Sequence, residues 1–141
     1  MAVYPHSPLN QMYRYMTMLV NANSCEWIVL DGVLDLDRLR RAARAVERRH
    51  IVLNSFQSKQ GLQFVWNQWP DEGETDIRYS RIPNMPDDER HELLLKNIWQ
   101  EQLPLTKGRA WRIHVTEDES GKTWLQIITT HVFTDGRSAN I

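Results

Sequence analysis

The stretch from residue 111 to residue 130 most constrains the fold, because strand-like patterns lie on both sides of one turn. Apolar and polar side chains alternate over residues 111–115. Residues 118–122 (DESGK) have the composition of a turn, and residues 124–130 (WLQIITT) form an apolar, β-branched run. This pattern predicts a β-hairpin and excludes a purely helical bundle.

The rest of the chain mixes helical and strand patterns. Helices are predicted from Ser7, which can cap a helix ahead of Pro8, from Asp35 to about His50, and from Pro86 until Pro104 ends the helix. Strands are predicted at residues 27–30, 62–66 and 77–82. This order favours an α/β fold, a mixed sheet with packed helices, over a barrel or a bundle.

Two predictions concern burial. Leu9, Met12, Tyr13 and Met16 recur at helical spacing, and we expect this stripe to belong to the core rather than to a ligand site. The run Trp27-Ile28-Val29-Leu30 is nearly continuous in apolar residues, which is typical of a strand covered on both faces.

Length and charge narrow the function classes. The 141 residues suit one domain, and the net charge of -1 gives no long-range attraction to nucleic acid or anionic membranes. A local basic cluster is predicted to form the solvated face of a helix, the alternative being a stripe that binds RNA or phosphate. Its members are Arg38, Arg40, Arg41, Arg44, Arg48 and Arg49.

The number of cysteines and the lengths of the apolar runs indicate the cellular compartment of the protein. Cys25 is the only cysteine, so an intrachain disulfide is impossible and a reducing compartment fits best. The first residues lack the pattern of a signal peptide, and no apolar run approaches the ~20 residues that cross a bilayer. We expect a cytoplasmic protein.

The chemistry-bearing motif follows the apolar run 124–130. His131 is expected at the exit of a strand, Asp135 follows four positions later, and Gly136 gives the backbone freedom to turn. An imidazole that reaches into a cavity can act as a general base. Spacing alone favours a structural histidine beside an ordinary Asp-Gly turn, and a metal site lacks a second ligand at suitable spacing.

His131-x-x-x-Asp135-Gly136 resembles the HxxxDG motif of the condensation-domain and CoA-dependent acyltransferase superfamily, the chloramphenicol acetyltransferase-like proteins. Further segments resemble the family in the same order along the chain. They are 7–11 (SPLNQ), 34–42 (LDLDRLRRA), 49–56 (RHIVLNSF) and 103–105 (LPL) with the hairpin after it. By this resemblance, residues 1–141 are the N-terminal lobe of a condensation or acyltransferase domain, and we expect a truncated chain.

The resemblance implies a role for each motif residue. His131 would deprotonate or orient an amine or hydroxyl that attacks a thioester carbonyl, Asp135 would shape the loop by pairing with an arginine, and Gly136 would give the backbone room. Thr130 stands where condensation domains carry a first histidine, and Asn54 stands where the family has an arginine. We therefore expect Arg112 to replace that arginine as the partner of Asp135.

The implied function is acyl transfer from a pantetheine thioester to an amine or alcohol, as in nonribosomal peptide synthesis. The implied donor is acyl-CoA or an acyl-phosphopantetheine on a carrier protein, with no tightly bound cofactor and no metal. The lone lobe is expected to be inactive and to self-associate. Two alternatives stay open: a non-catalytic module that docks carrier proteins, and an unrelated α/β domain with a chance motif.

Overall fold

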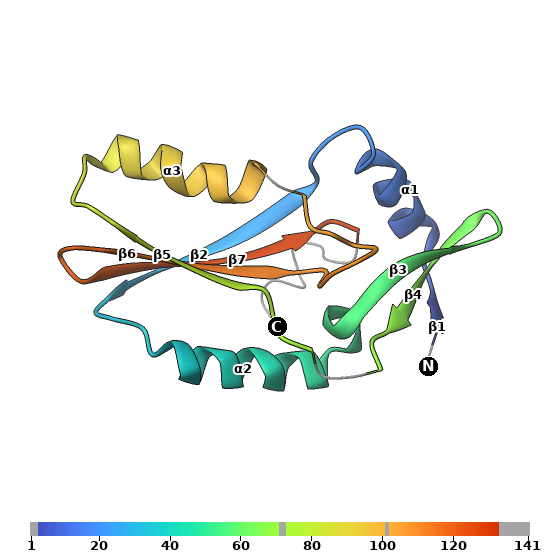
Figure 1. Ribbon diagram of the computed structural model, residues 1–141. Coiled ribbons are helices and arrows are strands. Elements are labelled where there is room, and N and C mark those ends of the chain that lie inside the picture. Colours follow the sequence, from blue (N-terminus) through green and yellow to red (C-terminus); the bar gives the residue numbers. More distant parts are fainter. Residues whose placement is uncertain (1–2, 71–72, 101, 133–141) are drawn as a thin grey trace.

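The computed structural model describes residues 3–70, 73–100 and 102–132 (Figure 1). Its helices are α1 (Pro8–Met16), α2 (Leu36–Arg49), the short 3-10 helix η1 (Ile51–Asn54) and α3 (Asp87–Trp99). Its strands are β1 (Val3–Pro5), β2 (Asn23–Asp31), β3 (Ser55–Gln60), β4 (Gln63–Gln68), β5 (Ile77–Ile82), β6 (Arg112–Asp118) and β7 (Lys122–Thr130). The α/β class expected from the sequence is confirmed.

The strands form two sheets. A four-stranded sheet has the order β2-β7-β6-β5, and a three-stranded sheet has the order β1-β4-β3. The predicted hairpin is β6–β7, with Arg112 paired to Ile128. β5 and β6 run parallel, and α3 supplies the crossover that a parallel pair needs. β7 therefore lies inside the larger sheet, hydrogen-bonded on both sides.

Two helices sandwich the larger sheet, with α3 over one face and α2 over the other (Figure 1). Ala43 of α2 packs with Trp111, Ile113, Val115 and Leu125, which are all buried. On the opposite side, Ile98 of α3 belongs to a second core with Leu103, Leu105, Ala110, Ile128, Val132 and Trp66. The second core reaches the small sheet through Trp66 and so joins the two sheets.

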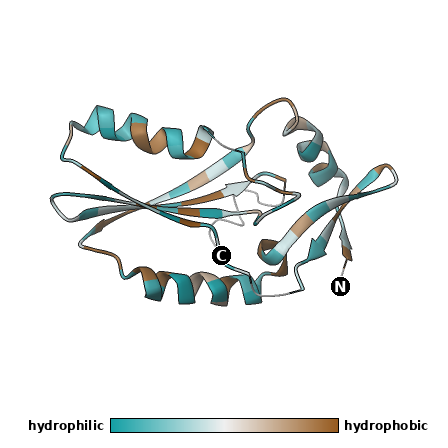
Figure 2. Cartoon of the chain, in the orientation of Figure 1, coloured by the Kyte–Doolittle hydropathy of each residue, from teal (hydrophilic) through white to brown (hydrophobic). Residues whose placement is uncertain are grey.

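Local signals explain where the first two helices begin. The Ser7 hydroxyl accepts a hydrogen bond from the Asn10 backbone N–H at 3.2 Å, and Pro8 occupies the first turn of α1. The Asp35 carboxylate accepts from the Arg38 N–H at 2.9 Å at the start of α2. The six arginines of the basic cluster are exposed, in keeping with a solvated face, and α2 is largely hydrophilic in Figure 2.

The prediction of a strand covered on both faces is wrong, and the prediction of a core stripe on α1 holds only for Tyr13. On α1, Leu9, Met12 and Met16 are 55%, 49% and 42% exposed, and only Tyr13 of the stripe contacts the core. In β2, Ile28 and Val29 are also exposed. The reason is positional: β2 is an edge strand of its sheet, and no described element covers the outer face of α1.

Candidate active site

His131 directly follows the last residue of β7, the strand-exit position that the sequence predicts. Its backbone N–H donates to the Ala22 carbonyl at 3.1 Å, which ties the exit of β7 to the residue before β2. Its imidazole is exposed and stacks on the Tyr13 ring of α1, with 5.8 Å between ring centroids and 27° between planes. The backbone is thus fixed while the ring stays reachable from outside.

The two neighbours of His131 are anchors. Thr130 is 2% exposed, and its hydroxyl donates to the Ala22 carbonyl at 3.4 Å and accepts from the Val132 N–H at 3.4 Å. Val132 is fully buried in the core that joins the two sheets. Thr130 therefore serves a structural role that fixes the backbone on the N-terminal side of the imidazole.

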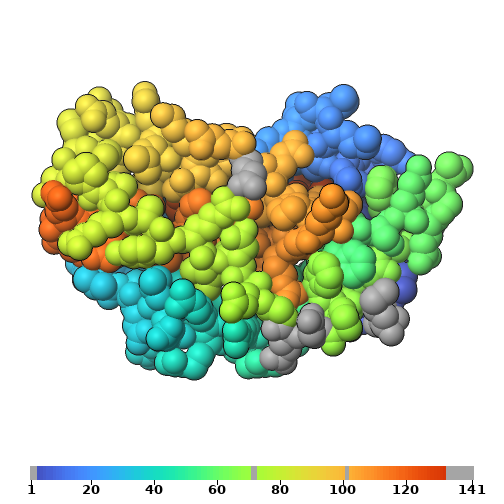
Figure 3. All heavy atoms as spheres, in the orientation of Figure 1, coloured from blue at the N-terminus to red at the C-terminus, as the bar shows by residue number. Residues whose placement is uncertain are grey.

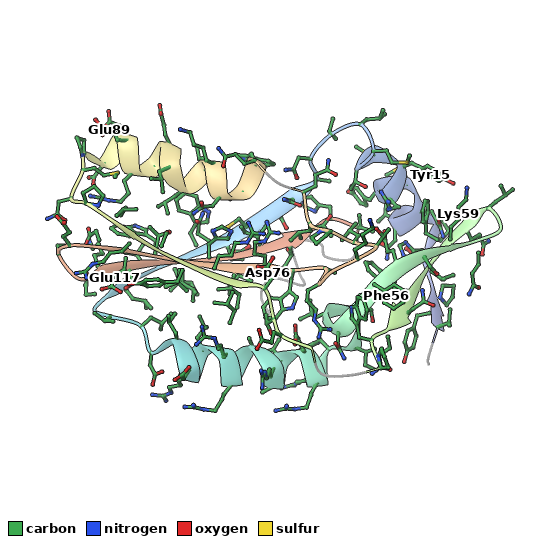
Figure 4. All side chains as sticks on the ribbon, viewed as in Figure 1. Tyr15, Phe56, Lys59, Asp76, Glu89 and Glu117 are labelled. Atoms are coloured by element: carbon green, nitrogen blue, oxygen red, sulfur yellow. The ribbon has the colours of Figure 1, made fainter. Side chains whose placement is uncertain are left out.

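Asp135 and Gly136 lie outside the described residues, so the predicted Arg112–Asp135 pair stays a prediction. The structure pairs Arg112 with another acid: its Nε donates to Asp76 Oδ2 at 2.6 Å, and the Arg112 side chain is buried rather than on a polar face. Asp76 marks the entrance to β5 in Figure 4. Burial raises the pKa of Asp76, but the hydrogen bond and charge of Arg112, helped by Arg78, lower that pKa below its usual value.

Asn54 takes part in a separate buried network. Its side-chain oxygen accepts from Arg109, whose Nε lies 3.9 Å from Glu47 Oε1. The same Glu47 oxygen accepts from the Trp111 indole N–H at 2.9 Å. Because Glu47 and Arg109 are 5% and 8% exposed, this network is a structural brace between α2, η1 and the segment before β6.

Two other residues with reactive side chains are structural. Burial lowers the pKa of His6 to about 4, and its ring stacks on Trp66 with centroids 4.9 Å apart. Burial raises the pKa of Cys25 to about 12, so its thiolate is scarce at neutral pH. Across residues 3–70, 73–100 and 102–132, no group of three or more His, Cys, Asp or Glu side chains could hold a metal ion.

Sequence reasoning missed the supports of His131. Tyr13 packs against the core as predicted, but its ring also lies against the imidazole, a contact that was not predicted. Ala22, a backbone acceptor, carries no side-chain signal at all. Only the position of Tyr13 on an apolar helix face hinted at such a contact.

Of the helices in the described ranges, none is both long enough and apolar enough to cross a lipid bilayer.

The fold is shared with solved structures of condensation domains. The X-domain from teicoplanin biosynthesis aligns with a TM-score of 0.78 and 17% identity over 96% of this chain and 29% of that chain. The condensation domain from Monacolin K polyketide synthase MokA aligns with a TM-score of 0.67 and 21% identity over 92% and 30%. The first condensation domain of the calcium-dependent antibiotic synthetase, bound to a substrate analogue, gives 0.77 and 16% over 98% and 36%.

The chain thus spans about a third of the length of these domains and has the fold of their N-terminal portion. Neither a protein-family model nor the sequence of a curated protein matches it. At these identities the likeness shows the fold.

Proposed function

We propose that this chain is the N-terminal lobe of an acyltransferase of the condensation type, with His131 as its general base. The observation that carries the proposal is the exposed imidazole on a fixed backbone at the exit of β7, within the fold of condensation domains. Acyl-CoA or an acyl-phosphopantetheine on a carrier protein is the proposed donor. An amine or an alcohol is the proposed acceptor.

In the proposed reaction, the acceptor nitrogen or oxygen attacks the thioester carbonyl while His131 takes the proton of the acceptor. The C–N or C–O bond forms, the C–S bond breaks, and the proton goes to the departing sulfur to give a free thiol. Asp135 and Gly136 shape the loop in this proposal. Because donor and acceptor are held together, much of the rate would come from positioning.

The test uses the full-length gene product that contains this chain. His131→Ala should lower the rate of acyl transfer by about 10²–10⁴-fold, the usual contribution of a general base, with an unchanged unfolding transition. The matched control is His91→Ala, because His91 is an exposed histidine on α3. Unchanged product formation by the His131 variant would end the proposed role and leave His131 as a structural residue.

The exposed apolar surface of α1 favours a second candidate, a non-catalytic module that docks carrier proteins. Leu9, Met12 and Met16 continue into Met18, Leu19 and Val20, which are 67%, 86% and 53% exposed. Contiguous apolar patches of this kind mark interaction sites. Self-association of the chain through the same surface is a further expectation that follows from it.

The two candidate functions predict different results for carrier-protein binding and for acyl transfer. Met16→Asp should weaken binding of a phosphopantetheinylated carrier protein at least tenfold if the module docks carriers through α1. Val33→Asp is the control, since Val33 is also exposed, at 73%, but belongs to the connection between β2 and α2, which lies far from α1 (Figure 1). Carrier binding without any acyl transfer by the full-length protein would favour the module. Light scattering at several concentrations reports self-association.

A further inference from the structure

A small polar pocket, with a cavity volume of about 150 Å³, lies at the end of β7, where Thr130 lines it. Its walls come from the end of α1, the residues before β2, the segment after α3 and the end of β7. In Figure 3 the end of α1 (blue) and the segment after α3 (orange) lie side by side at the surface. Gln102 joins them, because its side-chain N–H donates to the Thr17 carbonyl at 3.1 Å.

The pocket and His131 are linked through neighbouring residues. Thr130, which lines the pocket, directly precedes His131. Ala22 also lines the pocket, and its carbonyl accepts the His131 N–H. Tyr13, which stacks on the imidazole, is the chain neighbour of the pocket residue Arg14. A molecule held in the pocket would therefore contact Thr130 and Ala22, the residues that fix the backbone of His131.

Arg14 is the charged group among the described residues that line this pocket. Its Nη1 donates to the Thr17 hydroxyl at 2.9 Å, and its guanidinium carbon lies 5.0 Å from the centre of the Phe64 ring. These contacts hold the guanidinium in one orientation. Across the described ranges no carboxylate pairs with Arg14, and its buried Nε has no acceptor.

The charge and hydrogen-bond donors of Arg14 favour an anionic ligand in this pocket. A guanidinium stays charged in proteins and presents a planar fork of N–H donors that matches a carboxylate. The amide of Asn23, by contrast, already donates to the Ile98 carbonyl at 3.0 Å and braces the wall. Arg14 thus supplies a fixed positive charge that the described part of the protein does not neutralise.

We propose that the Arg14 pocket binds a carboxylate of the molecule on which His131 acts. The identity of that molecule rests on the proposed function. The phosphate of a phosphopantetheine arm lies at the far end of the arm from the thioester, so a pocket lined by Thr130, the residue before His131, suits a carboxylate near the reacting centre. The carboxylate belongs either to an amino-acid acceptor or to the distal end of a dicarboxylic acyl group.

The test is a titration of the ¹⁵N-labelled chain, followed by nuclear magnetic resonance, with two pairs of probes. S-succinyl-pantetheine against S-butyryl-pantetheine examines a carboxylate on the acyl group, and L-alanine against L-alaninamide examines a carboxylate on the acceptor. We expect saturable shifts at the amides of Thr17, Ala22 and Thr130 with the carboxylate member of one pair. The member of that pair without the carboxylate should bind at least tenfold more weakly, because a charge-assisted fork is lost.

Variants test whether the carboxylate binds in the Arg14 pocket. Arg14→Gln should weaken the same binding at least tenfold, whereas Arg44→Gln, an exposed arginine of α2, should leave it unchanged. His131→Ala should keep the binding, so failure of the proposed function and failure of this inference give different results. Equal binding by wild type and Arg14→Gln, or saturable shifts with neither carboxylate, would overturn the inference. If Arg14→Gln does not fold, Arg14→Lys, which keeps the charge but loses the fork, must show weaker binding.

Discussion

Replacing Glu47 by glutamine or alanine tests the buried network around Arg109. Glu47 accepts from the Trp111 indole at 2.9 Å and lies 3.9 Å from Arg109 Nε, and both side chains are nearly inaccessible to water. Removing one member of a buried ion pair costs about 3–5 kcal/mol. Because the Glu47–Arg109 distance is long and Arg109 keeps Asn54 as an acceptor, we expect Glu47→Gln to lose about 3 kcal/mol.

The Glu47→Ala variant separates the hydrogen bond with Trp111 from the ion pair with Arg109. A glutamine side chain still offers an oxygen to the Trp111 N–H, whereas alanine leaves this buried donor without a partner, at a further cost of about 1–3 kcal/mol. The free energy of unfolding is measured by urea titration for each variant. Glu92→Gln on the exposed face of α3 is the control and should stay within about 0.5 kcal/mol of wild type. A Glu47→Gln variant as stable as this control would refute the reasoning.

Three further predictions concern single groups. The pKa of His6 is 6.5 in the unfolded chain and about 4 in the folded protein. The stability that neutral His6 provides is therefore complete above pH 6.5 and is lost as the pH falls toward 4. The loss approaches about 3 kcal/mol, and urea midpoints across this range should show a smaller pH dependence in His6→Phe, which keeps a ring against Trp66. Cys25, with a pKa of about 12, should react with a thiol reagent at pH 8 far more slowly in the native protein than in urea. The pKa of Asp76 is lowered in the folded protein, so its ionised carboxylate stabilises the fold at pH values above 3.8, the pKa in the unfolded chain. This stabilisation is lost as the pH falls below that value. Calorimetry of Asp76→Asn should show that this part of the acid dependence is absent.

The sequence predicted the elements whose signals are local. Ser7 and Pro8 placed the start of α1, and the strand-period alternation over residues 77–82 placed β5. β3 was missed because its buried side chains are Ser55 and Gln57, so its inward face is polar and hydrophobic periodicity cannot reveal it. β1 is only three residues long.

Burial proved harder to predict than secondary structure. Periodicity shows that one face of a helix is apolar, but not that the same chain covers it, and Leu9 and Met12 of α1 are exposed. At the candidate site, the position of His131 at a strand exit was predictable from the apolar run before it. Its contacts with Tyr13 and the Ala22 carbonyl join segments more than a hundred residues apart, and no local pattern encodes them.

The central place of β7 determines when this chain can fold. β2 pairs with β7 along its whole length, from Asn23 opposite Thr130 to Asp31 opposite Lys122, so these contacts wait until residues 122–130 have been made. At the usual rate of synthesis, about 5–20 residues per second, β2 spends several seconds as an unpaired strand with Ile28 and Val29 uncovered. This high contact order predicts slow folding, and during that interval β2 is the segment most exposed to aggregation and to chaperones.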